Sequence, residues 1–339
     1  MSMICAHTEP PTYPDSLKGR SLLTTNSFSD EEMAALIDLA SQLKARKAAG
    51  VRGDLLLRRH IALVFEKSST RTRSASAIAA ADEGATTEYL SPADSHFGKK
   101  ESVKDSARVL GRMYDGILFR GFRQDTVEQL AEYSGVPVWN GLTDLCHPTQ
   151  VLADLMTVRE SFGDLGPHLT FAYVGDGRNN VANSLMMGCA KAGVRFVNCT
   201  PPELDPDPTL VAQAREIAVR HGSDIRVEHD PAVGVRGANV LYTDVWVSMG
   251  EEAKREERLR LLRPYQVNMG LAEKTGNLGG GLIFLHCLPA FHDNETEMSR
   301  ECGALEVSND VFESPWSRVF DEAENRMHTI KALFVSALA

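Results

Sequence analysis

The sequence lacks the features that would place it in a membrane or on a secretory route. It has no apolar run of the roughly 18 or more residues that a membrane-spanning helix needs. Residues 1–20 hold no apolar core of signal-peptide length, and they include two acidic residues. We therefore expect a soluble, cytoplasmic protein with no membrane partner.

The sequence also has no excess of basic residues. Its 36 lysines and arginines stand against 46 acidic residues, which gives a net charge of −10. Since nucleic-acid-binding proteins usually present a basic face, this balance argues against DNA or RNA as a partner. Against such an acidic background, a local cluster of arginines indicates a small anion.

Cysteine is sparse and scattered. Six cysteines are spread over 339 residues without a CxxC pair, so the pattern does not indicate a disulfide framework. The pairs Cys146-His147 and His286-Cys287 lack zinc-ligand spacing, and no HExxH motif occurs. We expect a reducing compartment and no bound metal.

Two nucleotide-binding signatures are missing as well. The phosphate loop GxxxxGK[ST] does not occur. Residues 175–180 read GDGRNN after a strand-like run, but Asn180 stands where the GxGxxG fingerprint needs its third glycine. We therefore expect no nicotinamide and no other cofactor.

Strand-like and helix-like segments alternate along almost the whole chain, which is typical of parallel α/β architecture. The length of 339 residues, 43% of them hydrophobic, suggests two domains. The polar, Gly/Pro-containing segment 160–170 separates two alternating series. We predict two lobes, each with a central, mainly parallel sheet flanked by helices, and a cleft between them. The first lobe comprises residues 1–152 and a returning C-terminal helix at 321–339, and the second comprises residues 153–320.

The predicted strands are short apolar runs bounded by turn residues or helix-like segments. They lie at 60–67, 86–91, 116–121, 136–141, 169–177, 194–202, 224–230, 239–246 and 281–289.

The segment 68–73, SSTRTR, lies between an apolar run and an Ala-rich, helix-like segment. Arg71 and Arg73 thus stand where a helix begins, and each cation at that positive end of the helix dipole should cost roughly 0.3–1 kcal/mol. A bound anion would remove this cost, because hydroxyl and backbone N–H groups can wrap a phosphate while Arg71 adds charge-assisted bonds. An ordinary Ser/Thr cap with solvated arginines remains the alternative.

Other polar side chains follow other predicted strands. Five such positions come at or soon after the end of an apolar run: Arg120, the HPTQ segment 147–150, the segment 176–180, Asp244 and the pair His286-Cys287. Since ligands of parallel α/β folds bind at the carboxyl ends of strands, we expect these groups to line a site. The imidazole, hydroxyl and amide of HPTQ can hold a carbonyl or phosphoryl oxygen as it gains charge. Taken singly, a core histidine in HPTQ and a buried thiol after His286 remain alternatives.

The motifs FEKSSTRTR, HPTQ, DVWVSMGEE, FLHCLPAFHD and ENRMHTIKA together resemble those of ornithine carbamoyltransferases. The resemblance runs from about Leu22 to the C-terminus. STRT and HPTQ are shared with aspartate carbamoyltransferases, whereas DxxxSMG and HCLP indicate ornithine. It implies an enzyme of arginine metabolism that transfers the carbamoyl group of carbamoyl phosphate to the side-chain amine of L-ornithine, giving L-citrulline and phosphate. Direct amine attack through a tetrahedral intermediate is expected, in a homotrimer with shared active sites.

The resemblance also implies the site residues. The carbamoyl phosphate ligands would be Ser69, Thr70, Arg71, Thr72, His96, Arg120, His147, Pro148, Thr149, Gln150, Cys287, Leu288 and Arg326. The ornithine ligands would be Asn180, Asp244, Ser248 and Met249. Catalytic roles would fall to Arg120, His147, Gln150 and Cys287. His96 stands where many relatives have a glutamine that reaches the phosphate of a neighbouring subunit, and a surface loop histidine is the alternative.

The nearest alternative is a carbamoyltransferase for another amine, putrescine or aspartate. Aspartate would need added cations in the second lobe, whereas Asp244 suits an ammonium group. Putrescine would leave the groups expected to bind the α-carboxylate without a ligand. More distant alternatives are an NAD-linked oxidoreductase and a non-catalytic binding protein. Both a biosynthetic and a catabolic direction, and both a trimer and larger assemblies, are compatible with these motifs.

Overall fold

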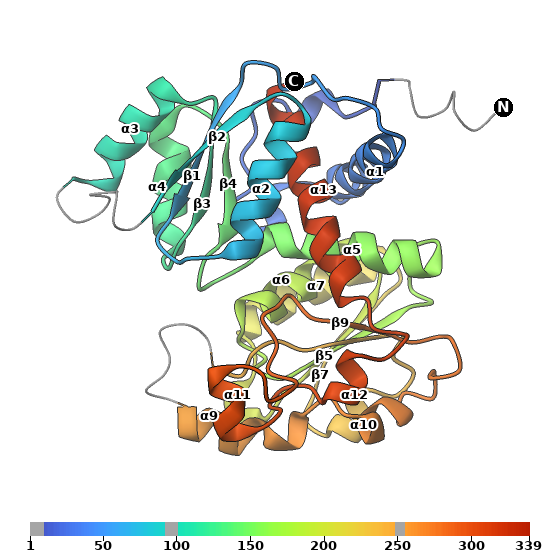
Figure 1. Ribbon diagram of the computed structural model, residues 1–339. Helices are drawn as coiled ribbons and strands as arrows, with labels where there is room; N and C mark the ends of the chain where they lie inside the picture. The colour runs from blue at the N-terminus through green and yellow to red at the C-terminus, as the bar shows by residue number, and fades with distance from the viewer. Residues whose placement is uncertain (1–9, 92–100, 248–254) are drawn as a thin grey trace. The chain divides into compact units, whose positions relative to one another are not determined.

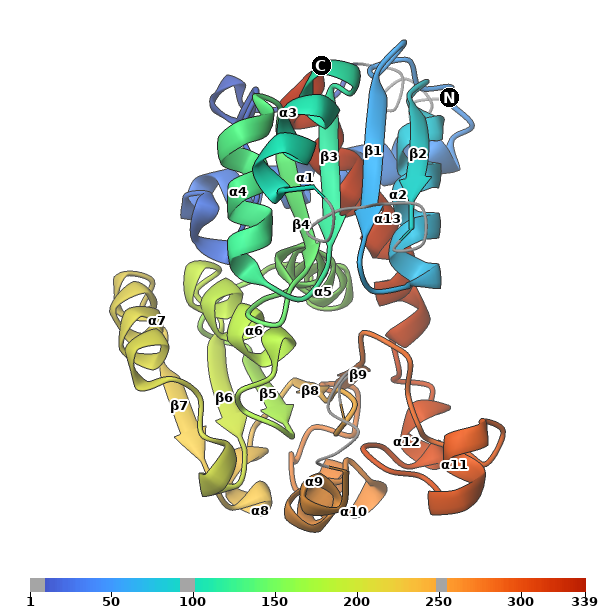
Figure 2. The same ribbon diagram turned by 90° about the vertical axis from the view of Figure 1, so that its left-hand side faces the viewer.

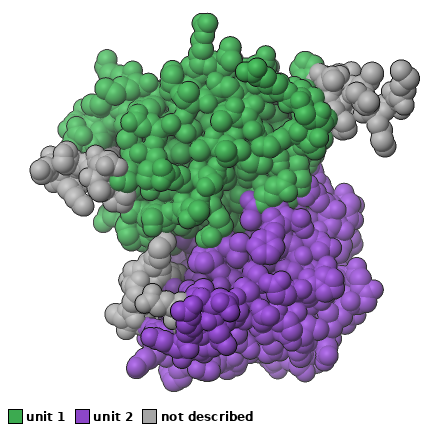
Figure 3. All heavy atoms as spheres, viewed as in Figure 1, with its two compact units in different colours: residues 1–156, 324–339 green, residues 157–323 purple. Residues whose placement is uncertain are grey.

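The computed structural model describes residues 10–91, 101–247 and 255–339. These residues form two compact units, which Figure 3 colours separately. Unit 1 contains the chain up to residue 156 together with residues 324–339, and unit 2 contains residues 157–323. Each unit has its own parallel sheet. The predicted fold class of two parallel α/β lobes is therefore confirmed, as is the return of the C-terminal helix to the first lobe.

The sheet of unit 1 has the strand order β2-β1-β3-β4. Its strands are β1 (His60–Phe65), β2 (Thr86–Leu90), β3 (Gly116–Arg120) and β4 (Val138–Leu142). Its helices are α1 (Asp30–Ala48), α2 (Thr70–Asp82), α3 (Val103–Met113), α4 (Gln124–Ser134), α5 (Pro148–Phe162) and α13 (Val319–Leu338), with short 3₁₀ turns η2 (Asp15–Leu17) and η3 (Thr25–Ser27). The helices α3 and α4 cover one face of this sheet, and α2 and α13 cover the other (Figures 1 and 2).

The sheet of unit 2 has the strand order β7-β6-β5-β8-β9. Its strands are β5 (Thr170–Val174), β6 (Arg195–Cys199), β7 (Ile225–Glu228), β8 (Val240–Tyr242) and β9 (Ile283–Leu285). Its helices are α6 (Asn180–Lys191), α7 (Pro208–Arg220), α8 (Pro231–Gly234), α9 (Arg255–Leu262), α10 (Met269–Glu273), α11 (Glu297–Cys302) and α12 (Asn309–Phe312), with 3₁₀ turns η4 (Pro202–Leu204) and η6 (Arg263–Tyr265). All nine predicted strands are thus present in the described part of the chain.

Buried parallel strands explain why the strand signal in the sequence is strong. Five of the six residues of β1 are buried, as are all five of β3 and of β5. A strand covered by helices on both faces reads as a continuous apolar run. The edge strand β2, in contrast, has no buried residue. Among the described helices, none combines the length and the apolar character needed to cross a membrane.

The strand order of each sheet predicts where a ligand can bind. In unit 1 the chain passes from β1 to the edge strand β2 and returns to β3 on the other side of β1. In unit 2 it runs outward from β5 to β7 and returns to β8, beside β5. Ligands of open α/β sheets bind at the carboxyl ends of strands at such reversals. The candidate positions are therefore the ends of β1 and β3 in unit 1, and of β5 and β8 in unit 2.

Candidate functional site

The SSTRTR segment leads from β1 into α2, as predicted. Ser69 is the N-cap of α2, and its hydroxyl accepts a hydrogen bond of 3.2 Å from the amide of Thr72. The first turn of α2, which the structure describes in full, contains no acidic residue. The guanidinium of Arg73 lies 3.9 Å from the centroid of the Tyr89 ring, a cation–π contact. Ser69 therefore is an ordinary cap, and Arg73 has a partner that needs no anion, which leaves the anion argument to Arg71.

Two further guanidinium groups converge on the hydroxyl of Thr72 at the same helix start. Arg326 of α13 donates from Nη2 to Thr72 Oγ1 at 3.2 Å, and Arg120 at the end of β3 donates from Nη1 to the same oxygen at 3.5 Å. All three side chains are buried. Buried charge is costly unless it is compensated. This concentration of positive charge at a helix N-terminus suits a small anion.

The HPTQ segment completes the cluster in unit 1. Gln150 accepts a hydrogen bond from Nη1 of Arg326 and donates from Nε2 to Asp154 at 2.8 Å. His147 lies with Nε2 3.4 Å from Nη1 of Arg326 and with Nδ1 3.4 Å from the hydroxyl of Thr149. Pro148 is the first residue of α5, a position that tolerates its missing N–H.

The protonation state of His147 follows from its surroundings. Burial lowers the pKa of His147 well below its ordinary value, and the charges of Arg326, Arg120 and Arg71 lower this pKa further. The imidazole is therefore neutral at pH 7. It can donate one N–H to an oxygen and adds no further positive charge to the cluster.

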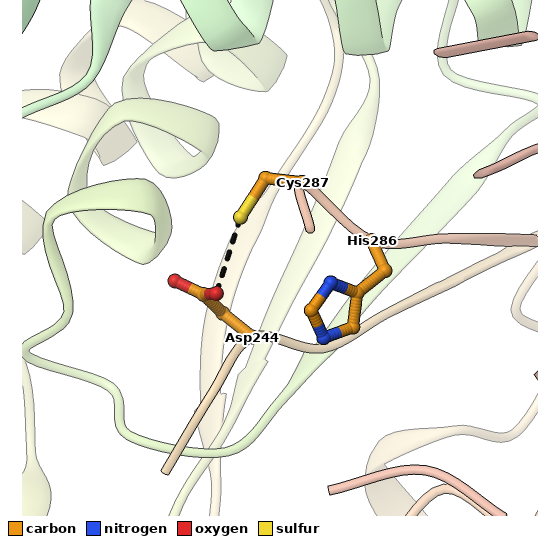
Figure 4. A group of neighbouring side chains, drawn as sticks. All are labelled: Asp244, His286 and Cys287. Carbon is orange, nitrogen blue, oxygen red and sulfur yellow. Dashed lines mark hydrogen bonds between the residues drawn. The ribbon is translucent and has the colours of Figure 1, made fainter. Parts of the chain in front are cut away.

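In unit 2 the carboxylate of Asp244, just after β8, accepts three hydrogen bonds. Asn179 donates from Nδ2 to Oδ2 at 3.0 Å, and the amide of Val245 donates to Oδ1 at 2.8 Å. The thiol of Cys287 donates to Oδ1 at 3.1 Å (Figure 4). A thiol that donates to a carboxylate carries its proton, and it is not the thiolate that a covalent mechanism would need.

The residue that faces Asp244 is Asn179, one position before the predicted Asn180. Asn179 is the N-cap of α6 and also accepts a 2.7 Å hydrogen bond from the amide of Val181. Asn180 is half-buried in the first turn of α6. The polar stretch 176–180 is predicted to belong to the site, but within it the resemblance assigns the ornithine contact to Asn180 and not to Asn179.

A buried ion pair lies beside this group. Arg258 of α9 contacts Asp176, with 2.6 Å between Nη1 and Oδ2, and both side chains are buried. Burial raises the pKa of Tyr173 well above its ordinary value, and the charges of Asp244 and Asp176 raise it further. Because Arg258 compensates Asp176, Asp244 is the carboxylate left to attract a cationic ligand. Asp176 belongs to the polar stretch 176–180 that follows a predicted strand, whereas no signal in the sequence marks Arg258.

Asp244, His286 and Cys287 offer ligand atoms that lie within 4.8 Å of one another (Figure 4). Both ring nitrogens of His286 nevertheless face protein groups. Its Nδ1 accepts a 2.9 Å hydrogen bond from the amide of Leu288, and its Nε2 lies 3.3 Å from Oε1 of Glu306. A metal ion would have to displace one of these groups, so the contacts favour a hydrogen-bonded cluster.

Comparison with known proteins supplies the relationship that this geometry suggests. The family model described as "Aspartate/ornithine carbamoyltransferase, carbamoyl-P binding domain" matches residues 20–160, and the one described as "Aspartate/ornithine carbamoyltransferase, Asp/Orn binding domain" matches residues 168–337. The chain belongs to the aspartate/ornithine carbamoyltransferase family.

Several relatives within this family are close in sequence. The "Ornithine carbamoyltransferase, catabolic" of Bacillus licheniformis is 56% identical over 95% of this chain and 97% of its own length. The protein of the same name from Enterococcus faecalis is 54% identical over 95% of this chain and 96% of its own. Among solved structures, ornithine carbamoyltransferase from Pyrococcus furiosus has a TM-score of 0.87 at 40% identity, covering 95% of this chain and 98% of that chain.

The carbamoyltransferase family models and the structure divide the chain differently at its end. The second model continues to residue 337, whereas residues 324–339 belong to unit 1 in the structure. Arg326 thereby joins Thr72, Arg120 and Gln150, although the sequence places it after the whole of unit 2. The sequence resemblance predicted this return, and the structure confirms it.

Some of the predicted site residues are in contact with one another, and others lie outside the described residues. Contacts join Thr72, Arg120, His147, Gln150 and Arg326 in unit 1, and Asp244 and Cys287 in unit 2. His96, Ser248 and Met249 lie outside the described residues. The sequence analysis did not find Asp154, which orients Gln150, or the buried glutamates behind His286.

Proposed function

We propose that this protein transfers the carbamoyl group of carbamoyl phosphate to the side-chain amine of L-ornithine, forming L-citrulline and phosphate. Relatives that are 52–56% identical over 95% of the chain are named ornithine carbamoyltransferase. One observation of the structure carries the proposal: two buried guanidinium groups converge on the hydroxyl of Thr72 at the start of α2.

The proposed carbamoyl phosphate site is the cluster in unit 1. The amides at the start of α2 and the guanidinium of Arg71 would hold the phosphate, together with Ser69 and Thr70. Arg120, His147, Gln150 and Arg326 would hold the phosphate and the carbonyl oxygen. Pro148, Thr149, Cys287 and Leu288 are further proposed contacts of carbamoyl phosphate.

The proposed chemistry is addition followed by elimination at the carbonyl carbon. The neutral amine of ornithine forms the new C–N bond, the carbonyl oxygen becomes an oxyanion, and the C–O bond to phosphate then breaks. Thr72, Arg120 and the neutral His147 would stabilise the oxyanion by hydrogen bonds from side chains that protein contacts already hold in position. The departing phosphate takes the proton from the nitrogen. Deprotonating an amine of pKa near 10.4 costs about 4–5 kcal/mol at pH 7, so the site must favour the neutral amine.

The proposed ornithine site is the Asp244 cluster in unit 2. The carboxylate of Asp244 would pair with the α-ammonium, and Asn180, Ser248 and Met249 would bind the α-carboxylate. The hydrogen bond from Cys287 to Asp244 supports a role in positioning and argues against a covalent intermediate. If Asp244 exchanged its hydrogen bond with Cys287 for one with the incoming ornithine, binding of ornithine would change the orientation of the Cys287 side chain.

We also propose a catabolic role. The relatives at 52–56% identity carry the word catabolic in their names, whereas an anabolic ornithine carbamoyltransferase from Campylobacter jejuni is 33% identical. The homotrimer, the contribution of His96 to a neighbouring subunit and the cytoplasmic location stay predictions.

A substrate comparison tests the proposal. Product formation from carbamoyl phosphate is measured with L-ornithine, putrescine and L-aspartate in parallel, and the absorbance of a nicotinamide cofactor is followed with each amine in the absence of carbamoyl phosphate. We expect citrulline from ornithine and little product from the other amines. Faster turnover of putrescine or aspartate would replace the proposed substrate, and a nicotinamide absorbance change without carbamoyl phosphate would refute the carbamoyltransferase assignment.

A further inference from the structure

The turn that follows β9, residues 286–291, is held by side chains at three backbone amides. The amide of His286 donates to Oε2 of Glu322 at 2.8 Å, and the amide of Leu288 donates to Nδ1 of His286 at 2.9 Å. The amide of Phe291 donates to Oε1 of Glu306 at 2.7 Å. Turn amides more often bond to the backbone of the turn or to water. The three side-chain acceptors therefore hold the 286–291 turn in one conformation.

The groups that hold the 286–291 turn are fully buried. His286 is 1% exposed, and Glu306, Glu322 and Tyr242 are 0% exposed. Oε1 of Glu322 accepts a further hydrogen bond of 3.3 Å from the hydroxyl of Tyr242. The backbone carbonyl of Glu306 accepts from the amide of Val267 at 2.9 Å. Buried carboxylates are costly unless hydrogen bonds compensate them. Both oxygens of Glu322 have such donors, whereas in Glu306 only Oε1 has one and Oε2 has none among the described residues.

These contacts fix the tautomer of His286. Since Nδ1 accepts the hydrogen bond from the Leu288 amide, we place the ring proton on Nε2. Nε2 lies 3.3 Å from Oε1 of Glu306, close enough to feel the negative charge although the two atoms do not form a hydrogen bond, and both side chains are 0% exposed. The carboxylate thus favours the tautomer that can accept from Leu288, as carboxylates commonly do for histidines that must hold one orientation.

The 286–291 turn carries Cys287 and Leu288, which belong to the proposed substrate contacts. Supported amides lie on both sides of Cys287, and its sulfur lies 3.1 Å from Oδ1 of Asp244. Leu288 has φ +59°, a left-handed conformation that costs a non-glycine residue roughly 1–2 kcal/mol. Such a conformation persists where surrounding contacts determine it, and the hydrogen bond to His286 is one such contact.

We propose that His286, Glu306 and Glu322 are positioning residues: they fix the 286–291 turn so that Cys287 and Leu288 present the geometry that the carbamoyl transfer needs. The catalytic consequence of this role depends on the proposed function. The support of the turn itself does not depend on it.

A matched pair of variants at His286 tests the proposal. In His286→Asn the side-chain oxygen falls near the position of Nδ1 and can still accept from Leu288. In His286→Gln the amide nitrogen falls near Nε2 and can reach Glu306, but the acceptor for Leu288 is lost. We expect His286→Gln to raise the KM for ornithine about tenfold, the effect of one lost hydrogen bond, and His286→Asn to raise it less than about threefold. Because Cys287 and Leu288 are also proposed contacts of carbamoyl phosphate, its KM should rise in the same order, more in His286→Gln than in His286→Asn.

Two readouts are independent of activity. Amide hydrogen exchange in a peptide that covers the 286–291 turn should speed up in His286→Gln and stay close to wild type in His286→Asn. Alkylation of Cys287 by iodoacetamide, located by peptide mass spectrometry, should also be faster in His286→Gln than in wild type and close to the wild-type rate in His286→Asn. Cys302, which is also partly exposed, is the internal reference and should react equally in all variants.

Equal ornithine KM, exchange and alkylation in His286→Gln, His286→Asn and wild type would overturn the proposal. If His286→Gln does not fold, Glu322→Met takes its place, because methionine has a similar length and offers the His286 amide no carboxylate or carbonyl acceptor. Unchanged exchange and ornithine KM in this variant would overturn the proposal equally. A wild-type protein that forms no citrulline would refute the proposed function, whereas the exchange and alkylation data would still decide whether the support exists.

Discussion

Replacing Arg326 with methionine should nearly abolish turnover, because this side chain joins three parts of the proposed carbamoyl phosphate site. Arg326 donates to Thr72 at 3.2 Å and to Gln150, and it lies 3.4 Å from the ring of His147. Hydrogen bonds to a charged group contribute about 1.5–3 kcal/mol each. Two such bonds to carbamoyl phosphate amount to about 3–6 kcal/mol, or roughly 10²- to 10⁴-fold in kcat/KM.

The assay measures citrulline formation at saturating ornithine while carbamoyl phosphate is varied. Lys331→Met is the matched control, because Lys331 is a second buried cation on α13 and contacts Asp82, with 2.6 Å between Nζ and Oδ2. This control should lower the thermal stability, although Lys47 still contacts Asp82, and it should leave kcat/KM within about threefold of wild type. Among the charges that lower the pKa of His147, Arg326 has the largest effect. Arg326→Met should therefore also raise the pKa of His147. A folded Arg326→Met with kcat/KM within tenfold of the control would refute the reasoning.

Three further predictions concern Asp244, Cys287 and acid stability. Asp244→Asn should raise the KM for ornithine by roughly 30-fold or more, because loss of one partner of a buried charge pair costs about 2–5 kcal/mol. Steady-state kinetics measure this effect, and equal changes in the KM for ornithine and the KM for carbamoyl phosphate would contradict the prediction. Cys287→Ser should retain part of the activity, and mass spectrometry of the wild type during turnover should find no carbamoyl adduct at Cys287; a trapped adduct would exclude the proposed mechanism. Burial lowers the pKa of His147 well below its ordinary value and that of His328 to about 4. The unfolded chain binds these protons near pH 6.5, so the free energy of unfolding should fall as the pH drops from about 6.5 towards 4, by up to about 1.4 kcal/mol per pH unit for each histidine. Urea unfolding at several pH values measures this slope, which should shrink in His328→Gln; an equal slope in both proteins would contradict the assignment.

The strands and the start of α2 could be predicted because their signals are local. Both central strands of unit 1 are apolar except for one terminal residue each, His60 in β1 and Arg120 in β3, and the N-cap of α2 is a serine three positions before the amide that it binds. The partner of Arg73 could not be found in the same way. Tyr89 belongs to the next strand, and its ring reaches Arg73 only after β2 has paired with β1.

The site residues of unit 2 show a second limit of sequence reasoning. A shift of one position at a helix start turns a side chain by about 100°, and this shift separates Asn180 from Asn179, which contacts Asp244. Glu322 lies 36 positions from the amide of His286 that it binds. No motif marks such a contact, because a buried glutamate far along the chain resembles a surface glutamate until the fold buries it.

The charges of the two candidate half-sites provide the strongest physical argument about substrate choice. In unit 1, three arginines act on His147 strongly enough to help keep it neutral, and such a potential selects an anion. In unit 2, Arg258 compensates Asp176, which leaves Asp244 to select a cation. Aspartate as the second substrate would bring two carboxylates and one ammonium towards Asp244, with a net repulsion. Ornithine brings two amino groups and one carboxylate, so the same carboxylate that repels aspartate attracts ornithine.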